Sequence, residues 1–437
     1  MRCFSSLMET RYFSAILKRK ATLEGILVQG IPVFLLTYVF FIPFPHTTAI
    51  KEICFYVPLT LTLILIGSNR ISFSFKTPLS LPFALFTCWA IIDLYFALDK
   101  GNSIHDIYAH LLKYMAFYFM VVNFFDSARK LSLLIWVLIA SAVVLSLGSI
   151  VYFYIFKGAT ISGQLGYNFP EISPNILSLL LLPAVILSLN CALRTATFGR
   201  RMLFIFPLLI TVVSLFLTQT RSTFLALILG ASILLLKNIK MLLIVILGIV
   251  VIAGIMPGRD RFSVSSIIDK ILYTDRIKIG LAFIEIVKDY PVTGIGFGMQ
   301  TYYDDKMLEK YNSRLPPQFR QEVPHKAPHN ILIDISVRLG LVGLALFLYI
   351  WFSFIRMSCK LIGKGRTDFV RNWGLCFLSI FIAILIPGMV ENTNSGPPAV
   401  FLYTVFALTT ITNNLDRQQE PAVDEAGNLM VGQLGKQ

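Results

Sequence analysis

Long apolar runs separated by short polar connections dominate the hydropathy pattern of this chain. A helix needs about 20 mainly apolar residues to cross a bilayer, so runs of that length are interpreted as membrane spans. The pattern therefore predicts an all-α, polytopic membrane bundle of about twelve transmembrane helices. The expected spans are 25–44, 50–67, 79–97, 104–126, 131–156, 174–192, 202–218, 222–236 (short for a full crossing), 239–256, 331–356, 372–390 and 397–413.

The composition supports the same class. Of the 437 residues, 56% are hydrophobic and 14% are charged, whereas soluble domains carry about 25% charged residues. A soluble enzyme, a disordered chain and a secreted disulfide scaffold are all disfavoured. The six cysteines form no CxxC pair and fall in spans or on the expected cytoplasmic side, so neither a disulfide nor a metal site is indicated.

Lysine and arginine set the expected orientation, because cytoplasmic loops of membrane proteins are enriched in them. With the N-terminus in the cytoplasm, every even-numbered connection is basic, so twelve spans with both ends in the cytoplasm form a consistent topology. Much of the net charge of +14 then reflects topology, and no nucleic-acid partner is indicated. The first residues lack the cleavage site of a removed signal peptide. The basic residues assigned to the cytoplasm include Arg2, Arg11, Lys18, Arg19, Lys20, Arg70, Lys76, Arg129, Lys130, Arg194, Arg200, Arg201, Lys237, Lys240, Lys360, Lys364, Arg366 and Arg371.

One outer segment is far longer than the others and carries charges of both signs. Helical spacing of apolar residues predicts two helices in it, at 276–290 and 301–314, so we expect a helical cap over the bundle. The second sizeable outer loop, 157–173, is expected to flank the same cavity. The division expected is 1–256 with nine spans, 257–330 as the cap, 331–413 with three spans, and 414–437 as a cytoplasmic tail.

Arg221 is conspicuous because it lies in TQTRS (218–222), at the outer junction of two spans. Positive charge is depleted on that side, and charges at membrane depth are functional candidates by default. The alternative is an interfacial arginine whose head group reaches toward water. We interpret Arg221 as a candidate anion-binding residue.

Arg276 is the second candidate, in TDRIKIG (274–280). It falls in the first turn of an expected helix, where the helix dipole disfavours a cation and a bound phosphate would reverse that preference. Two guanidiniums suit a diphosphate, which arginine binds bidentately. A solvated helix face paired with Asp275 is the alternative. Arg259 and Arg261 are less specific, and proximity to lipid head groups explains them.

His329 lies in VPHKAPHN (323–330), immediately before the tenth span. Histidine can take a proton from a hydroxyl nucleophile at neutral pH, and Asn330 can cap the helix that follows. A polar residue at a helix start is the alternative. A metal site shared with His325 is not expected, because Pro324 and Pro328 oppose the helix that would align the two rings.

Three further features have weaker signals. Glu391, at the outer end of the eleventh span, could orient a cation or cap the helix. GIGFG (294–298) lacks the context of a dinucleotide fingerprint and is interpreted as a flexible turn that folds the cap back. A polar stripe on the fourth span could line a cavity or lie at the interface; it consists of His105, Asp106, His110 and Lys113.

The three main candidates would converge on the outer face, where nucleotide-activated donors are absent. A group-transfer enzyme there needs a donor activated beforehand and delivered in the membrane, such as a polyprenyl diphosphate. Arg221 and Arg276 would offset charge on the leaving group, and His329 would activate an acceptor hydroxyl. No carboxylate cage for a divalent ion is evident, so no metal and no cofactor are expected.

The chain resembles the O-antigen ligase and polymerase superfamily. The resemblance rests on TQTRS, on DRIKIG (275–280), on VKDYPVTGIGFG (287–298), and on PHN followed by ILIDISVRLGLVG (331–343). It implies a bacterial inner-membrane enzyme that transfers a glycan from undecaprenyl diphosphate, on the periplasmic face, by an inverting, metal-independent mechanism. For a ligase, the resemblance implies that the acceptor is a sugar of the lipid A core.

The same resemblance implies diphosphate contacts by Arg221 and Arg276 and a base role for His329. An O-antigen polymerase with a lipid-linked acceptor is the first alternative, followed by a protein O-glycosyltransferase. A transporter is a further alternative, but no repeat relates the first six spans to the last six, as paired-repeat transporters show.

Overall fold

The computed structural model describes residues 23–160, 162–166, 172–236, 238–255, 275–391 and 393–418. This part of the chain is helical and contains no strand, which confirms the all-α, polytopic class. Arg259 and Arg261 lie outside the described residues, as do the basic N-terminal residues and most of the expected tail.

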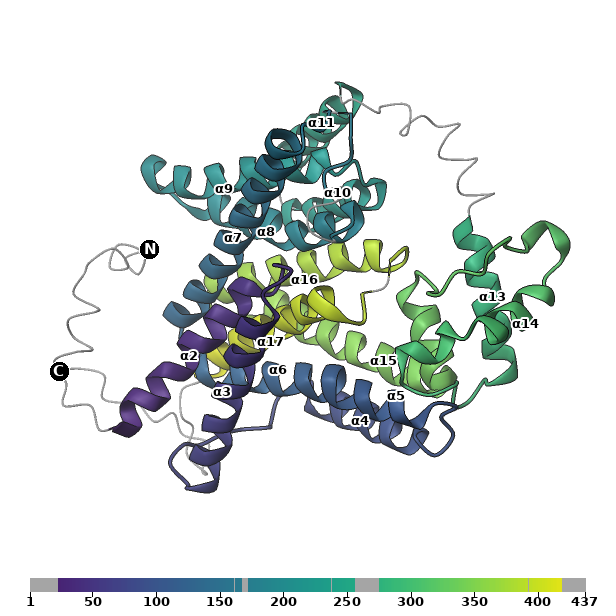
Figure 1. Cartoon of the computed structure of the whole chain (residues 1–437). Coiled ribbons are helices and arrows are strands. Elements are labelled where there is room, and N and C mark those ends of the chain that lie inside the picture. Colours follow the sequence, from purple (N-terminus) through teal and green to yellow (C-terminus); the bar gives the residue numbers. More distant parts are fainter. Residues whose placement is uncertain are drawn as a thin grey trace.

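Each of the twelve expected windows coincides with a helix or a continuous helical run (Figure 1). In chain order these are α2 (Leu23–Phe41), α3 (Thr48–Gly67), α4 (Ser80–Asp93), α5 (Lys100–Asp106) continued by η2 (Ile107–Leu112) and α6 (Lys113–Phe124), α7 (Ala128–Ile150) continued by η3 (Val151–Phe156), α8 (Pro174–Arg194), α9 (Phe198–Leu217), α10 (Arg221–Leu235), α11 (Ile239–Ile255), α15 (Ile331–Lys364), α16 (Asp368–Gly388) and α17 (Gly396–Gln418).

Seven of these twelve runs are both long and apolar enough to cross a membrane: α3, α5–α6, α7–η3, α8, α9, α15 and α16. Apolar stretches of α2, α4, α10 and α11 are shorter, and the expected short span at 222–236 is indeed a helix of only 15 residues. Length and composition therefore establish a multi-pass membrane protein, whereas the total of twelve crossings stays a prediction.

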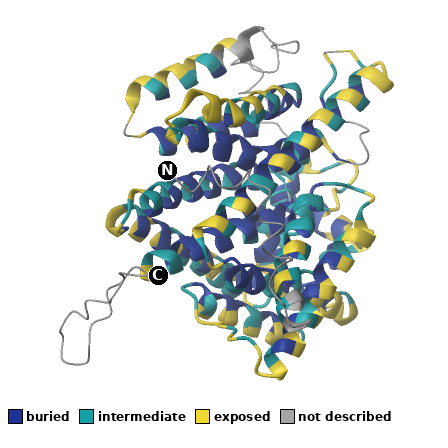
Figure 2. Ribbon diagram, turned by 90° about the vertical axis from the view of Figure 1, so that its left-hand side faces the viewer, coloured by how far each residue is buried: buried dark blue, intermediate teal, exposed yellow. Residues whose placement is uncertain are grey.

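The centre of the bundle is formed by α8 and α16. Helix α8 contacts α7, α9, α10, α16 and α17, and 83% of its apolar window is buried. Helix α9 is peripheral, and only 28% of its window is buried. Figure 2 shows this gradient from buried centre to exposed periphery. Exposed apolar residues follow one face of α9 and are suited to contact with lipid tails; they are Leu203, Phe206, Leu209 and Val213.

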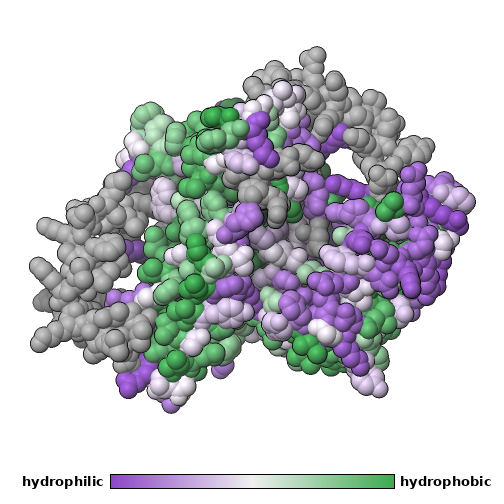
Figure 3. All heavy atoms as spheres, in the orientation of Figure 1, coloured by the Kyte–Doolittle hydropathy of each residue, from purple (hydrophilic) through white to green (hydrophobic). Residues whose placement is uncertain are grey.

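The segment that joins α11 to α15 forms the expected helical cap, whose described part is 275–330. It contains α13 (Asp275–Asp289), η5 (Met299–Tyr303), α14 (Asp305–Ser313) and η6 (Pro317–Phe319). Its own apolar cluster includes Phe283, Ile286 and Tyr302, and Val337 of α15 belongs to the same cluster. The cap is therefore packed onto the bundle, and its hydrophilic surface lies beside the apolar helices (Figures 1 and 3).

GIGFG (294–298) is a tightly packed connection, so its interpretation as a flexible turn is wrong. The Ile295 N–H donates to the Val337 carbonyl at 2.9 Å, and the Gly296 N–H donates to the Arg338 carbonyl at 3.0 Å. A Cβ atom on Gly294 or Gly296 would lie within 2.6 Å of atoms of α15 or of the α4–α5 turn. The glycines allow the close approach of backbones, which fixes the cap instead of loosening it.

Gly340 is the matching break in α15, with φ +66° and ψ −172°, a conformation essentially confined to glycine. The Leu341 N–H beyond it donates to the Pro291 carbonyl at 2.8 Å. The first part of α15, 331–339, thus lies against the cap and is joined to the rest of the helix by this single residue.

Gly340→Ala is expected to destabilise the protein by about 3 kcal/mol or more, because its Cβ would be strained and would lie 2.1 Å from the Val292 carbonyl oxygen. The melting temperature of the detergent-solubilised protein measures the effect. It is obtained from the amount of folded protein that size-exclusion chromatography detects after heating. Gly363→Ala is the matched control in the same helix, since nothing lies within 4 Å of its added Cβ. Equal melting temperatures for the two variants would show that the break is not required.

Candidate functional site

The candidate site is centred on Glu391, in the loop between α16 and α17. Its side chain is only 14% exposed. The Arg276 Nη2 atom donates to its Oε1 at 3.5 Å, and the Asn175 Nδ2 atom donates to the same oxygen. The His329 Nδ1 atom lies 3.3 Å from Oε2. Three distant segments of the chain therefore meet at one carboxylate.

His329 reaches Glu391 because of an unusual backbone conformation. Its φ is +47°, a left-handed value rare outside glycine, and it lies between the buried Pro328 and the helix cap Asn330. Nδ1 is buried and lies within ion-pair distance of the carboxylate. Strain of this kind persists only where surrounding contacts enforce it, and it concentrates at functional sites.

Asn330 ties the two sides of the site together. Its Oδ1 accepts from the Leu332 and Ile333 N–H groups at 2.9 and 3.1 Å, which caps α15 as expected. Its Nδ2 donates to the Met389 carbonyl at 3.1 Å. The start of α15 is thereby fixed to the loop that carries Glu391.

Arg276 is the second residue of α13, and its side chain is 46% exposed. One edge of the guanidinium faces Glu391, so the remaining N–H groups are available to an approaching ligand. The position in the first turn of a helix agrees with the expectation, and the helix dipole adds to the local positive potential.

The turn that carries Arg221 is connected to the same cluster. It is the first residue of α10, and Thr220 before it donates through Oγ1 to the Asn175 Oδ1 atom at 3.4 Å. Gln219, with φ +51°, donates to the Ser162 carbonyl at 3.2 Å. The turn with Arg221 is therefore held both by the segment after η3 that contains Ser162 and by Asn175, the residue that contacts Glu391.

The electrostatics favour an ionised Glu391. Burial raises its pKa, but His329, the hydrogen bond from Asn175 and the charge of Arg276 lower it, and the net pKa lies below its usual value. One carboxylate partly neutralises the arginine and orients the histidine. The exposed part of the Arg276 guanidinium is the group at this cluster that an anionic ligand could reach.

His325 lies beside His329, with the two Nε2 atoms 3.3 Å apart and the ring centroids 4.5 Å apart. Burial and the neighbouring His329 lower the pKa of His325. Chain geometry between the prolines brings the rings together without a helix, which the sequence pattern did not suggest. Across the described part of the chain, no group of three His, Cys, Asp or Glu side chains is arranged to hold a metal ion.

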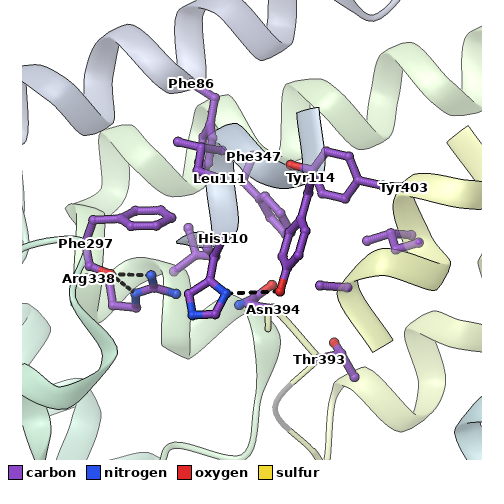
Figure 4. Close-up of a pocket in the computed structure, with 13 residues that line it drawn as sticks. Phe86, His110, Leu111, Tyr114, Phe297, Arg338, Phe347, Thr393, Asn394 and Tyr403 are labelled. Carbon is purple, nitrogen blue, oxygen red and sulfur yellow. Dashed lines mark hydrogen bonds between the residues drawn. The ribbon is translucent and has the colours of Figure 1, made fainter. Parts of the chain in front are cut away.

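The polar stripe on the fourth span divides into separate roles. Asp106 accepts from the Met299 N–H of the cap at 2.7 Å, and Lys113 pairs with Glu52 at 2.7 Å. His110 contacts the Tyr114 hydroxyl at 3.1 Å and lines a cavity of about 40 Å³ (Figure 4). That cavity has room for only a few water molecules.

A buried network beside this cavity links the cap to the loop of Glu391. Arg338, 2% exposed, donates from Nε to the Phe297 carbonyl at 2.7 Å and pairs with Asp334 at 3.4 Å. Tyr302 of the cap donates to one oxygen of Asp334 at 2.8 Å, and Asn394 donates to the other at 2.6 Å. Because removing one member would leave buried charge unpaired, the network holds the cap in a fixed position.

The structure thus brings Arg276, His329, Asn330 and Glu391 into direct contact or adjacency, and it connects Arg221 to them through Thr220 and Asn175. Arg259 and Arg261 cannot be placed. Asn175 and Thr220 were not predicted, because an asparagine at a helix start and a threonine before an arginine have ordinary local explanations. Only the tertiary fold reveals their shared contact.

The chain is a helical, multi-pass membrane bundle with a cap, and Arg276 of the cap and His329 meet at a carboxylate in the loop after α16. Residues 206–348 match the family model described as O-antigen ligase, and the match includes Arg221, Arg276 and His329. It confirms the resemblance to the O-antigen ligase and polymerase superfamily, whose members are membrane glycosyltransferase-like enzymes. No curated protein matches the chain.

Proposed function

We propose that this protein is an O-antigen ligase that transfers a glycan from undecaprenyl diphosphate to a sugar of the lipid A core. The observation that carries the proposal is the convergence of Arg276 and His329 on Glu391, and both of these cationic candidates lie within residues 206–348, which match the family. A cationic group for the leaving diphosphate and an oriented imidazole are the two requirements of such a transfer.

In the proposed reaction, the acceptor oxygen attacks the anomeric carbon as the bond from that carbon to the diphosphate oxygen breaks. The configuration inverts, and undecaprenyl diphosphate leaves with the bonding electron pair. Arg221 and Arg276 offset its charge, in the place that a metal ion takes in other transferases.

His329 accepts the acceptor's proton at Nε2, because Nδ1 faces Glu391 and is suited to hold its own proton toward that carboxylate. Glu391 orients the ring and stabilises the imidazolium, as the carboxylate of a catalytic triad does. The acceptor hydroxyl takes the place that the His325 ring occupies at Nε2. The 3.3 Å contact at Nδ1 is expected to shorten when substrates bind.

The topology belongs to the same proposal. Basic cytoplasmic loops put both chain ends in the cytoplasm of a bacterial inner membrane and the cap (275–330) in the periplasm. With this topology the chain divides into four parts, which end at residues 256, 330, 413 and 437. The donor's polyprenyl chain remains in the bilayer while its diphosphate reaches the cluster from the membrane surface.

Deletion of the gene is expected to leave lipid A core without O-antigen, while polymer accumulates on the lipid carrier. Gel banding of lipopolysaccharide, together with analysis of the carrier-linked glycan, measures this. Plasmid-borne wild type should restore the ladder of bands from core that carries O-antigen, whereas a membrane-inserted His329→Ala variant should not. Core that carries a single repeat unit would instead identify an O-antigen polymerase, and an unchanged ladder would contradict both functions.

A further inference from the structure

Asn175, the second residue of α8, lies between the turn with Arg221 and the carboxylate of Glu391. Its Nδ2 donates to Glu391 Oε1, and its Oδ1 accepts from the Thr220 hydroxyl at 3.4 Å. The three residues come from the start of α8, the α9–α10 turn and the loop after α16. The side chain is partly buried and uses both ends of its amide.

We propose that Asn175 is a positioning residue that holds Glu391 against His329 and fixes the Arg221 turn relative to that pair. The inference rests on the proposed function, since it assigns a purpose to the Glu391–His329 contact. Asn175 itself reaches neither the donor nor the acceptor; it acts through the carboxylate and the turn.

An amide is the side chain that this place requires. It must donate to an ionised carboxylate and accept from a hydroxyl at the same time, and asparagine combines both groups on a short, stiff stem. Aspartate would accept from Thr220 but repel Glu391, and alanine would leave one carboxylate oxygen with Arg276 alone. The donor to Oε1 also leaves Oε2 to face His329.

The start of α8, which carries Asn175, is itself held in place by neighbouring contacts. Ser173 caps the helix by accepting from the Ile176 N–H at 3.3 Å, and Ser178 contacts the Thr223 hydroxyl of α10 at 2.6 Å, one turn deeper. Helices α8 and α10 are thus fixed to each other directly below Asn175. The amide therefore contacts Glu391 from a fixed helix start, in addition to the contacts from Arg276 and His329.

The test is a double-mutant cycle on kcat/KM, with purified protein in proteoliposomes, a polyprenyl-diphosphate-linked oligosaccharide as donor and O-antigen-free lipopolysaccharide as acceptor. Asn175→Ala should lower kcat/KM about ten- to a hundredfold, as expected for loss of a hydrogen bond to a charged group. In a Glu391→Gln background the same change should have little further effect. Equal losses in both backgrounds would overturn the positioning role.

Asn175→Asp gives a second test, the pH profile of kcat/KM, which a change in packing alone would not shift. The variant keeps the shape of the side chain, and its added carboxylate near Glu391, Arg276, His325 and His329 favours the protonated form of the base. The acid limb of the pH profile of kcat/KM should therefore move to higher pH. An unshifted limb with lowered activity would assign Asn175 to folding only.

Ser188→Ala is the matched control, because this buried hydroxyl lies further along α8, about 20 Å from Asn175, and has no hydrogen-bond partner within the described residues. Its pH profile should match that of the wild type. Failure of the proposed function is distinguishable: His329→Ala and Arg276→Ala would then retain transfer. If both abolish transfer while the Asn175 cycle is additive, only the positioning role fails.

Discussion

Replacement of His329 by alanine is expected to lower glycan transfer by about 10²- to 10⁴-fold, the usual contribution of a positioned general base. The ring is held 3.3 Å from Glu391 by a backbone with φ +47°, which suits a base whose position is fixed. Transfer by reconstituted protein, with insertion checked by size-exclusion chromatography, measures the loss.

His325→Ala is the control that decides which histidine is the base. Its ring lies against His329 but is more exposed, it interacts with the Ala327 backbone, and its own backbone N–H donates to the Gln321 side chain at 3.0 Å. We expect its loss to be much smaller than that of His329→Ala. A larger loss for His325→Ala would reverse the assignment of the base.

The helices could be predicted from sequence because a span is a local property. Twenty apolar residues must satisfy their backbone hydrogen bonds within the segment, so hydropathy alone locates them. The conformation of Gly340 is not local in this sense. It is required by Val292 and Pro291, about 50 residues earlier, and nothing in the surrounding apolar sequence distinguishes it from a packing glycine.

GIGFG shows why glycines are ambiguous in sequence. The absence of a Cβ allows either a mobile turn or a close contact, and only the neighbouring backbone decides between them. Here the neighbours are the first part of α15 and the α4–α5 turn. The same glycines that suggested flexibility fix the cap to the bundle.

The candidate site was predictable only where charge was unusual for its location. Arg276 in a first helical turn and His329 before a span are conspicuous because membrane proteins contain few such groups, and their meeting at Glu391 supports their joint use. Asn175 has no such signal. Its importance depends on contacts with residues 45 and 216 positions away, which a single sequence does not report.

Replacement of Arg276 by alanine is expected to lower kcat/KM by about 10³-fold, because arginines that stabilise a leaving phosphate contribute about that much or more. Arg276→Lys should recover only part of the activity, since lysine keeps the charge but loses bidentate geometry. Arg221→Ala should act in the same direction. Initial rates at varied concentrations of a polyprenyl-diphosphate-linked oligosaccharide separate donor binding from the chemical step.

Arg314→Ala is the matched control for Arg276→Ala in the cap. Arg314 pairs with Asp289 at 2.8 Å at the far end of α13 and contacts the Tyr311 ring, so its loss removes one positive charge from the cap without touching Glu391. If general positive charge on the cap attracted the donor, both variants would weaken transfer alike. If Arg276 contacts the donor's diphosphate, only Arg276→Ala should lose transfer activity. That loss should be larger when the concentration of the donor limits the rate. Equal activity of the two variants would contradict the assignment of Arg276 to the diphosphate.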